Sequence, residues 1–363
     1  MLTLPHPRIE VAGALDLEAT PTGVIPRRLP RWTVPQVPAD MHRGVRGGSG
    51  VRLRLWPTAD AVTLRLRAAV YHPEAAPPQL VTALRGDAEA SAALERVCTL
   101  TDDGVPDRHA PFVDVRVPLP AGEGPVELWL PPGGVTEIAG VDASGLRELP
   151  EDTRTRWWHY GSSISQCSGA AGPLLTWPAL AARRLGLRLQ SLGFGGQAML
   201  DPFVARTLRD SDADAISLAV GINIQNGATM TARTFAPALH GFLDTIREGR
   251  PATPILLLSP IAFPDGEDRP GPLWFDAEGR AHPQGDPADV VNGALSVGAI
   301  RGLIAEVLAA REDAHLTFTD GRDLLGPSDA ALLPDGLHPS AEGYQILGER
   351  FARHARAIGF PAA

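Results

Sequence analysis

The pattern of apolar residues changes once along this chain of 363 residues, near residue 150. Before that point, short segments alternate apolar and polar residues, as half-buried antiparallel strands do. Gly and Pro clusters separate these segments, which are residues 51–56, 61–68, 111–117 and 125–130. No helical period of comparable strength precedes residue 150. The first part is therefore predicted to be an all-β domain, a sandwich of the jelly-roll type.

After Glu148–Asp152, short and nearly continuous apolar runs alternate with helical segments. Such runs are typical of parallel strands that helices cover on both faces. The predicted strands are 157–160, 187–192, 215–220, 255–259 and 316–319, and the predicted helices are 176–185, 202–209, 234–248, 292–311 and 340–357. This alternation indicates a three-layer α/β domain. The length suits two domains, predicted over residues 1–152 and 153–363.

One segment of the second domain, residues 261–291, is rich in Pro, Gly and Asp and has no clear period. A loop of that length inside a compact domain is usually functional or disordered. Trp274 and Phe275 in its middle favour a segment that packs. We expect it to fold over a binding site, with Trp274 and Phe275 as substrate contacts.

Composition excludes several classes of protein. Hydrophobic residues make up 44% of the chain and charged residues 21%, which is typical of a globular protein. The formal net charge of −9 argues against nucleic acid or an anionic membrane as partner. No apolar run reaches the roughly 20 residues of a membrane span. Residues 1–8 lack the pattern of a secretory signal, so we expect a cytoplasmic protein. Nothing in the pattern indicates an oligomeric state.

The chain has two cysteines, Cys98 and Cys167, which form neither a disulfide framework nor a thiolate metal site. Cys167 lies four residues after Ser163, and we interpret it as a small buried hydrophobic residue. The histidines show no metal-ligand spacing, so no metal is expected. His159 adjoins a candidate nucleophile, and its position in a strand suggests a role in the core or behind the site.

Four short segments carry the groups that acyl transfer through a serine requires. They supply, in order, a hydroxyl nucleophile, a flexible backbone N–H, an amide donor and a carboxylate–imidazole pair. The segments are Gly161–Ser165, Gly193–Gln197, Gly221–Asn223 and Asp335–His338. The first three follow predicted strands, at the sheet edge where open α/β sheets bind ligands. Taken singly, a segment of this kind is more often an ordinary turn than part of a catalytic site.

Within these segments several residues compete for each role. Ser162 and Ser165 are rivals of Ser163 as nucleophile, and Gly193 and Gly195 are rivals of Gly196 as N–H donor.

The last segment is less ambiguous. Asp335 lies three residues before His338, so its carboxylate can accept the imidazole Nδ1–H and leave Nε2 to take a proton.

The order and separation of the four segments resemble the GDSL family of lipases and esterases, also called SGNH hydrolases, over roughly residues 155–363. The resemblance implies a flavodoxin-like domain without metal or organic cofactor. It also implies a catalytic triad of Ser163, His338 and Asp335 and an oxyanion hole from the N–H groups of Ser163 and Gly196 with the Asn223 amide. Two positions depart from the family pattern, because Ser162 and Ile224 stand where the family has Asp.

The β-sandwich in front of this domain, with residues 192–198 and 218–223, resembles a branch of GDSL proteins that includes a salicylyl acyltransferase of tetracycline biosynthesis. This resemblance implies transfer of an aromatic acyl group from a CoA thioester to a hydroxyl of a polyketide. The expected partners are thus a small-molecule acyl donor and an alcohol acceptor, with acyl-CoA as co-substrate. The alternatives are a carbohydrate O-acetyl esterase, a general GDSL esterase, or a non-catalytic binding protein with a decayed site.

Overall fold

The computed structural model of the chain describes residues 1–70, 73 and 76–361, which form two compact units. The first unit comprises Met1–Arg154, Gln166–Leu180 and Arg188–Leu192. The second comprises Thr155–Ser165, Ala181–Leu187 and Gly193–Ala363. The predicted division into domains after residue 152 stays a prediction.

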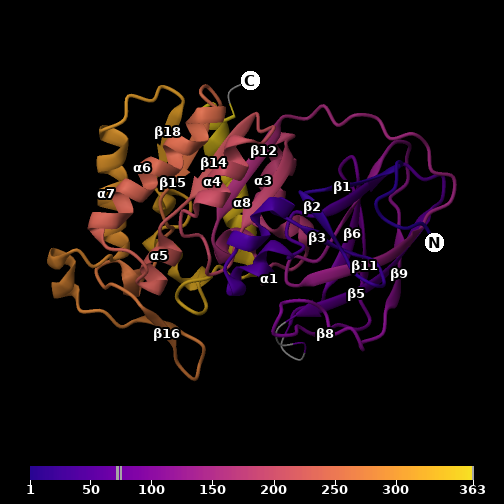
Figure 1. Ribbon diagram of the computed structural model, residues 1–363, viewed down its shortest axis with the longest axis horizontal. Coiled ribbons are helices and arrows are strands. Elements are labelled where there is room, and N and C mark those ends of the chain that lie inside the picture. The colour runs from indigo at the N-terminus through magenta and orange to yellow at the C-terminus, as the bar shows by residue number, and fades with distance from the viewer. Residues whose placement is uncertain (71–72, 74–75, 362–363) are drawn as a thin grey trace. The chain divides into compact units, whose positions relative to one another are not determined.

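The first unit contains two sheets whose strands are antiparallel except for the pair β5 and β8 (Figure 1). One sheet has the order β1 (Ile9–Ala12), β4 (Arg52–Leu55), β10 (Val126–Trp129), β6 (Leu80–Arg85) and β7 (Ala88–Ala93). The other has the order β2 (Asp16–Ala19), β3 (Val24–Arg27), β11 (Val135–Asp142), β5 (Ala61–Val70) and β8 (Cys98–Thr99), with β9 (Val113–Pro118) paired to β5. The predicted β-sandwich is confirmed.

Apolar and polar side chains alternate along the strands, and the apolar ones form the core of this unit. In β9, Val115 and Val117 are buried while Arg116 between them is exposed, as expected where one face of a strand meets a core. The four predicted strands correspond to β4, β5, β9 and β10. The sequence analysis missed the other strands, and it missed three short helical segments, η1 (Arg31–Gln36), η2 (Ala39–Met41) and α1 (His42–Val45).

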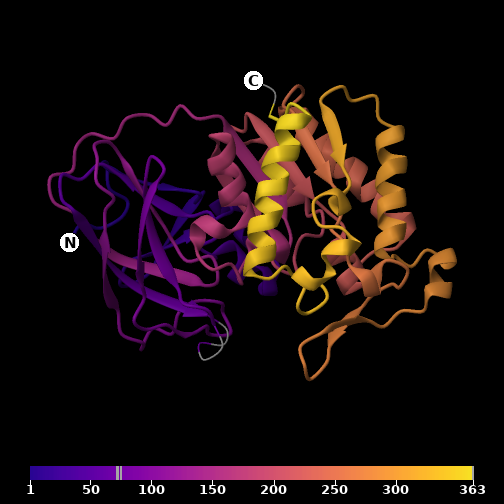
Figure 2. The ribbon, with the colours of Figure 1, turned by 180° about the vertical axis from the view of Figure 1, so that it is seen from behind.

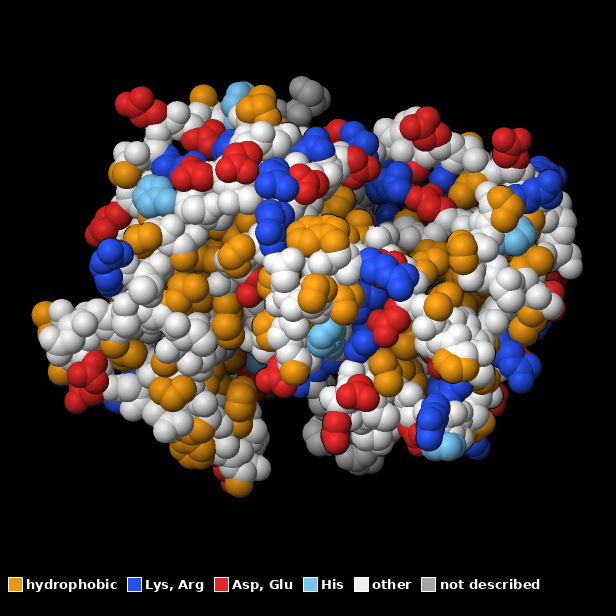
Figure 3. Space-filling view, viewed as in Figure 1, with side chains coloured by type: hydrophobic (Ala, Val, Ile, Leu, Met, Phe, Trp, Pro, Cys, Tyr) orange, Lys and Arg blue, Asp and Glu red, His pale blue; other side chains and the backbone are white. Residues whose placement is uncertain are grey.

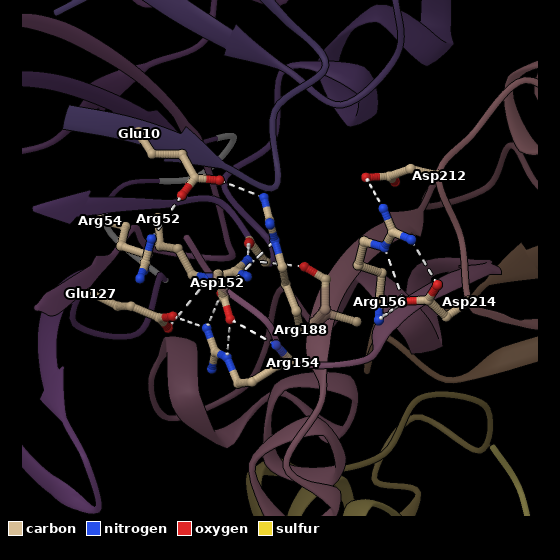
Figure 4. Close-up of polar contacts among 12 residues, drawn as sticks. Glu10, Arg52, Arg54, Glu127, Asp152, Arg154, Arg156, Arg188, Asp212 and Asp214 are labelled. Atoms are coloured by element: carbon tan, nitrogen blue, oxygen red, sulfur yellow. Dashed lines mark hydrogen bonds and ion pairs between the residues drawn. The ribbon is translucent and has the colours of Figure 1, made fainter. Parts of the chain in front are cut away.

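Buried charges also hold the first unit together (Figure 4). Glu127 lies 3.3 Å from Nε of Arg52 and also pairs with Arg154, which in turn binds Asp152 at 2.6 Å. Burial raises the pKa of Glu127, but the charges of Arg52 and Arg154 outweigh it and hold that pKa below its ordinary value. Arg52 further donates to the carbonyl of Leu189 at 2.9 Å. The cluster thus ties β4 and β10 to the strand that contains Leu189.

The parallel sheet has the order β13 (Arg188–Gly193), β12 (Arg156–Gly161), β14 (Ala215–Ala219), β15 (Ile255–Leu258) and β18 (Leu316–Thr319). Helices cover both of its faces, with α4 (Pro202–Arg209), α6 (Ala232–Gly249) and α7 (Val297–Ala309) on one (Figure 1). Helices α3 (Trp177–Leu185) and α8 (Ala341–Ala357) lie on the other (Figure 2), where Arg184 pairs with Glu349 at 2.6 Å. This is the predicted three-layer, flavodoxin-like arrangement, which is confirmed.

All five predicted strands and all five predicted helices of this region are present, with ends that differ by at most five residues. The apolar strand β15 is buried along its whole length, as a central parallel strand should be. Side-chain caps fix two helix starts, since Ser296 accepts from the Ala299 N–H and Ser340 from the Gly343 N–H. The same region also contains the short helical elements α2 (Ser163–Gln166), α5 (Ile222–Gly227), η3 (Pro173–Leu175), η6 (Gly321–Asp323) and η7 (Pro327–Leu332).

Residues 261–291, which showed no period, contain regular structure. They form η4 (Pro264–Gly266), a hairpin of β16 (Leu273–Phe275) and β17 (Ala281–Pro283), and most of η5 (Pro287–Asn292). The hairpin projects from the second unit (Figures 1 and 2). Contrary to the expectation of packing, Trp274 and Phe275 are 48% and 51% exposed, whereas Ala281, opposite Phe275, is buried.

One described segment, Pro287–Ala309, has the length and composition of a membrane span, with a mean hydropathy of 1.4. In the structure it is η5 followed by α7, and α7 buries Val297, Ile300, Ile304 and Val307. A core helix meets the same criterion.

We predict that Glu127→Ala lowers the free energy of unfolding by about 3–5 kcal/mol, because it leaves Arg52 buried without its carboxylate. The matched control is Glu123→Ala, which removes the exposed partner of Arg147 and should cost at most about 1 kcal/mol. Urea unfolding of both variants at pH 7 measures the difference. Equal losses would contradict a stabilising role for the buried cluster.

The lowered pKa of Glu127 predicts that its contribution to stability depends on pH. A carboxyl whose pKa is lowered by folding stabilises the protein above its ordinary pKa, and this contribution disappears as the pH falls through the lowered value. The difference in stability between the wild type and Glu127→Ala should therefore shrink from pH 7 to pH 3.

Candidate active site

Ser163 begins helix α2, two residues after strand β12 ends at Gly161. Its Oγ lies 2.8 Å from Nε2 of His338, within hydrogen-bonding distance. Between strand and helix the chain must turn sharply, and Gly161 has no room for a side chain, because a Cβ there would lie 2.2 Å from Oγ of Ser165. The sequence therefore places a hydroxyl at the carboxyl edge of the sheet on a tightly packed turn.

Asp335 and His338 lie on the turn before helix α8. Oδ2 of Asp335 is 2.6 Å from Nδ1 of His338, and Oδ1 accepts the backbone N–H groups of Leu337 at 2.8 Å and His338 at 2.6 Å. Burial raises the pKa of Asp335, but the hydrogen bond and charge of His338 and the two N–H groups lower it below its ordinary value. An ionised Asp335 accepts the Nδ1–H, so Nε2 faces Ser163 as the proton acceptor.

The two rival serines are engaged elsewhere. The Ser162 hydroxyl accepts from the Ile164 N–H at 3.2 Å, and Oγ of Ser165 bonds Nε2 of His159 at 2.7 Å. Both side chains are buried. The structure thus brings Ser163, and neither rival, to His338.

Of the three candidate glycines, Gly196 has the conformation that requires glycine. Its φ is +72°, in the left-handed region, while Gly193 and Gly195 are not among the residues with positive φ. A Cβ at Gly196 would meet nothing within 4 Å, so the backbone angle and not the available space demands glycine. Gly196 lies in the loop that follows β13.

Asn223 lies on α5, directly after strand β14, and is buried. Its Oδ1 accepts the N–H of Ala198 at 3.0 Å, which ties it to the loop that contains Gly196. Because Oδ1 is the acceptor of that bond, the amide NH₂ group is the end that can donate elsewhere. Ile224 is fully buried where the family pattern has a carboxylate.

Sequence reasoning missed two backbone contacts of this site. Ala198 supplies the bond that orients Asn223, and the N–H of Ala281 in β17 donates to the carbonyl of Asp335 at 2.8 Å. Both donors are backbone groups of alanines, so no residue type or spacing marks them. His159 was assigned to the core or to a place behind the site, and it is buried and bonded to Ser165.

The predicted substrate contacts, Trp274 and Phe275, lie on the β16–β17 hairpin, where hydrophobic side chains reach the surface (Figure 3). The ring of Trp274 lies 5.0 Å from that of His282 on the opposite strand. Their role as substrate contacts stays a prediction.

Two other kinds of site find no support in the described part of the chain. It holds no group of three or more His, Cys, Asp or Glu side chains placed to bind a metal ion. Cys167 is fully buried, and burial raises the pKa of its thiol, which makes it a poor nucleophile.

The part of the chain that contains the candidate active site matches a known protein family. The model of the GDSL-like lipase/acylhydrolase family matches residues 159–346, which is more than half of the chain and runs from within β12 to within α8. The chain belongs to the GDSL-like lipase/acylhydrolase family. The resemblance read from the four segments is thereby confirmed, and no curated protein sequence matched the chain.

Among solved structures, this GDSL protein is similar to SsfX3, a salicylyl-acyltransferase from a tetracycline biosynthetic pathway. The two share 30% identity with a TM-score of 0.81, over 99% of this chain and 97% of that one. A Bacteroides ovatus protein assigned as a GDSL-like lipase shares 18% identity with a TM-score of 0.69, over 97% and 96%. A family two carbohydrate esterase from Cellvibrio japonicus shares 15% with a TM-score of 0.59, over 97% and 96%. The last two show the fold alone.

We predict that Gly196→Ala slows acylation of Ser163, because a side chain at positive φ costs about 1–2 kcal/mol and forces this loop to shift. Gly186→Ala is a matched control, since Gly186 also has positive φ, +68°, and open space around it. Both variants should lose similar stability, and only Gly196→Ala should react more slowly with an activated ester. Equal rates in the two variants would remove Gly196 from the site.

Proposed function

We propose that the protein transfers acyl groups through a covalent intermediate on Ser163. The observation that carries this proposal is the unbroken hydrogen-bonded series from Ser163 Oγ to His338 at 2.8 Å and from His338 to Asp335 at 2.6 Å. A hydroxyl, an imidazole and a carboxylate in this series are the parts of a serine nucleophile with its base. Membership of a family of lipases and acylhydrolases supports the same chemistry.

In the first half of the reaction, Oγ of Ser163 attacks the carbonyl carbon of the acyl donor while Nε2 of His338 takes the hydroxyl proton. The bond from carbon to the leaving group breaks, and His338 returns the proton to that group. Asp335 keeps the imidazole in one tautomer and stabilises its charge. In the second half, a hydroxyl acceptor gives its proton to His338 and attacks the acyl-enzyme, and Ser163 recovers its proton as it leaves.

Negative charge develops on the carbonyl oxygen in both halves. We assign the N–H groups of Ser163 and Gly196 and the amide of Asn223 to this oxyanion. Donors that are fixed before the reaction begins usually make the largest contribution to such catalysis. The bond from Ala198 to Asn223 supports this assignment, because it engages Oδ1 and makes the NH₂ group the end that can donate.

For the substrates, we propose an aromatic acyl donor of the salicylyl type, presented as a CoA thioester, and a hydroxyl of a polyketide related to the tetracyclines as acceptor. Similarity over nearly the whole length of SsfX3, the β-sandwich included, supports this choice. The exposed aromatic rings of Trp274 and Phe275 suit flat aromatic ligands. The reaction needs no metal or organic cofactor, and we propose that it takes place in the cytoplasm.

The second candidate is hydrolysis, in which water replaces the alcohol acceptor. The fold shared with a carbohydrate esterase favours this candidate, with an O-acetylated carbohydrate as the substrate. Both candidates pass through the same acyl-enzyme, so the acceptor alone separates them.

Removing members of the triad tests the common step. Ser163→Ala and His338→Ala should each lower turnover of an aryl ester by roughly 10⁴- to 10⁶-fold, because the residues act as a unit. Circular dichroism should show an unchanged fold, and intact-protein mass spectrometry should show an acyl adduct in the wild type that Ser163→Ala lacks. Substantial activity in Ser163→Ala would require another nucleophile, and a wild type without turnover or acyl adduct would favour the non-catalytic binding protein.

Product analysis tests transfer against hydrolysis. With an aryl thioester and a panel of polycyclic alcohols, the Trp274→Ala, Phe275→Ala double variant should form more free acid and less ester than the wild type, while its acyl-enzyme forms at a similar rate. Phe318→Ala, which removes an exposed phenyl group from β18, is the control and should keep the wild-type ratio. Free acid as the sole product of the wild type across the panel would favour the esterase.

A further inference from the structure

A second histidine and serine lie directly behind the nucleophile, in positions that the proposed mechanism does not use. Nε2 of His159 lies 2.7 Å from Oγ of Ser165, and Nδ1 lies 2.7 Å from Oγ of Ser217. Ser217 also accepts the indole N–H of Trp157 at 2.8 Å. All these side chains are buried. The four groups form one hydrogen-bonded series inside the second unit.

This series connects the turn of the nucleophile to the middle of the sheet. His159 and Ser217 are paired across the neighbouring parallel strands β12 and β14. Ser165 lies two residues after Ser163, in the first turn of α2, and its N–H donates to the carbonyl of Ser162 at 3.0 Å. The bond from Ser165 to His159 therefore attaches that turn to two central strands.

The hydrogen bond of the neighbouring Ser162 side chain is local by comparison. The Ser162 hydroxyl, where the family pattern has a carboxylate, accepts from the N–H of Ile164, two residues away. Such a bond shapes the turn but does not attach it to the sheet. Gly161 provides the space for the attachment, because a Cβ at that position would lie 2.2 Å from Oγ of Ser165.

We propose that His159 and Ser165 are positioning residues that hold the first turn of α2 so that the Ser163 hydroxyl stays within reach of His338. The role rests on the proposed function, in which Ser163 is the nucleophile. A displacement of about 1 Å at a reacting group can cost on the order of 100-fold in rate. An anchor two residues from Ser163 is therefore placed to control the rate without contacting substrate.

The imidazole of His159 suits this role because it remains neutral. Burial lowers the pKa of His159 to about 3. A neutral ring donates with one nitrogen and accepts with the other, and a hydroxyl can do either, so both bonds of His159 are satisfied in either tautomer. Protonation of His159 therefore does not break the anchor near neutral pH.

The test compares Ser165→Ala and His159→Leu with the wild type. Both variants should react with a fluorophosphonate probe at Ser163, and turn over an aryl ester, roughly 10- to 100-fold more slowly in kcat, with KM nearly unchanged. His159→Gln keeps an amide N–H near the position of Nε2 and should recover a large part of the rate. Thr319→Val is the matched control, since it removes a buried hydroxyl that bonds His354 at 2.7 Å on the last strand of the sheet. It should cost similar stability and leave the labelling rate unchanged.

A crystal structure of Ser165→Ala gives a readout that does not depend on activity. The separation of Ser163 Oγ and His338 Nε2 should exceed 3.5 Å there, against 2.8 Å in the wild-type chain. Wild-type labelling by Ser165→Ala with an unchanged separation would overturn the positioning role, as would equal slowing by Thr319→Val. A failure of the proposed function looks different, because the wild type itself would then form no acyl adduct on Ser163.

Discussion

The order of the parallel strands is the constraint on which the rest of the site depends. From β12 the chain passes to β13 on one side, and from β13 it crosses to β14 on the other side of β12. Loops that leave neighbouring strands in opposite directions open a crevice at the carboxyl end of the strand between them. Ser163 follows that strand, and Asn223 follows β14. The topology thus brings together a hydroxyl and an amide 60 residues apart in sequence.

A structural feature could be predicted when a short stretch of residue types encodes it, and could not when it depends on contacts between backbone groups distant in sequence. Strand β15 reads as Ile-Leu-Leu-Leu, and its burial on both faces is visible in that run. The hydrogen-bonded series of Ser163, His338 and Asp335 was predictable because Asp335 and His338 lie within one turn and because Ser163 is part of a family motif. The bond from Ala198 to Asn223 was not, since a backbone N–H carries no residue signature. Trp274 was expected to pack, but a two-stranded hairpin has no second layer to cover it, and its ring lies on His282 instead.

The two departures from the family pattern both remove a carboxylate from buried positions. Ser162 and Ile224 are 3% and 0% exposed. A buried carboxylate requires a cation or several N–H donors to offset its loss of hydration. A neutral hydroxyl needs fewer hydrogen-bond partners than a carboxylate, and the Ile164 N–H is such a partner for Ser162. The aliphatic side chain of Ile224 needs no polar partner. In this chain Asp335 is the carboxylate bonded to His338, and the turn that carries Ser163 is attached to the sheet through neutral groups, Ser165 and His159.

The segment that carries the hairpin is attached to both halves of the candidate site. Nε2 of Gln225, on α5 with Asn223, donates to the carbonyl of Arg269 at 3.0 Å, and Ala281 donates to the carbonyl of Asp335. Gly271 fits so closely that a Cβ there would lie 1.8 Å from the Gln225 carbonyl oxygen. A lid that opened at these attachments would displace α5, which carries Asn223, and the turn that carries Asp335. Motion at the base of the segment would therefore disturb Asn223 and Asp335 together, and under the proposed function the choice between water and an alcohol would depend on the hairpin beyond it. Exposed aromatic rings on a fixed support favour a preformed acceptor surface over closure of a loop.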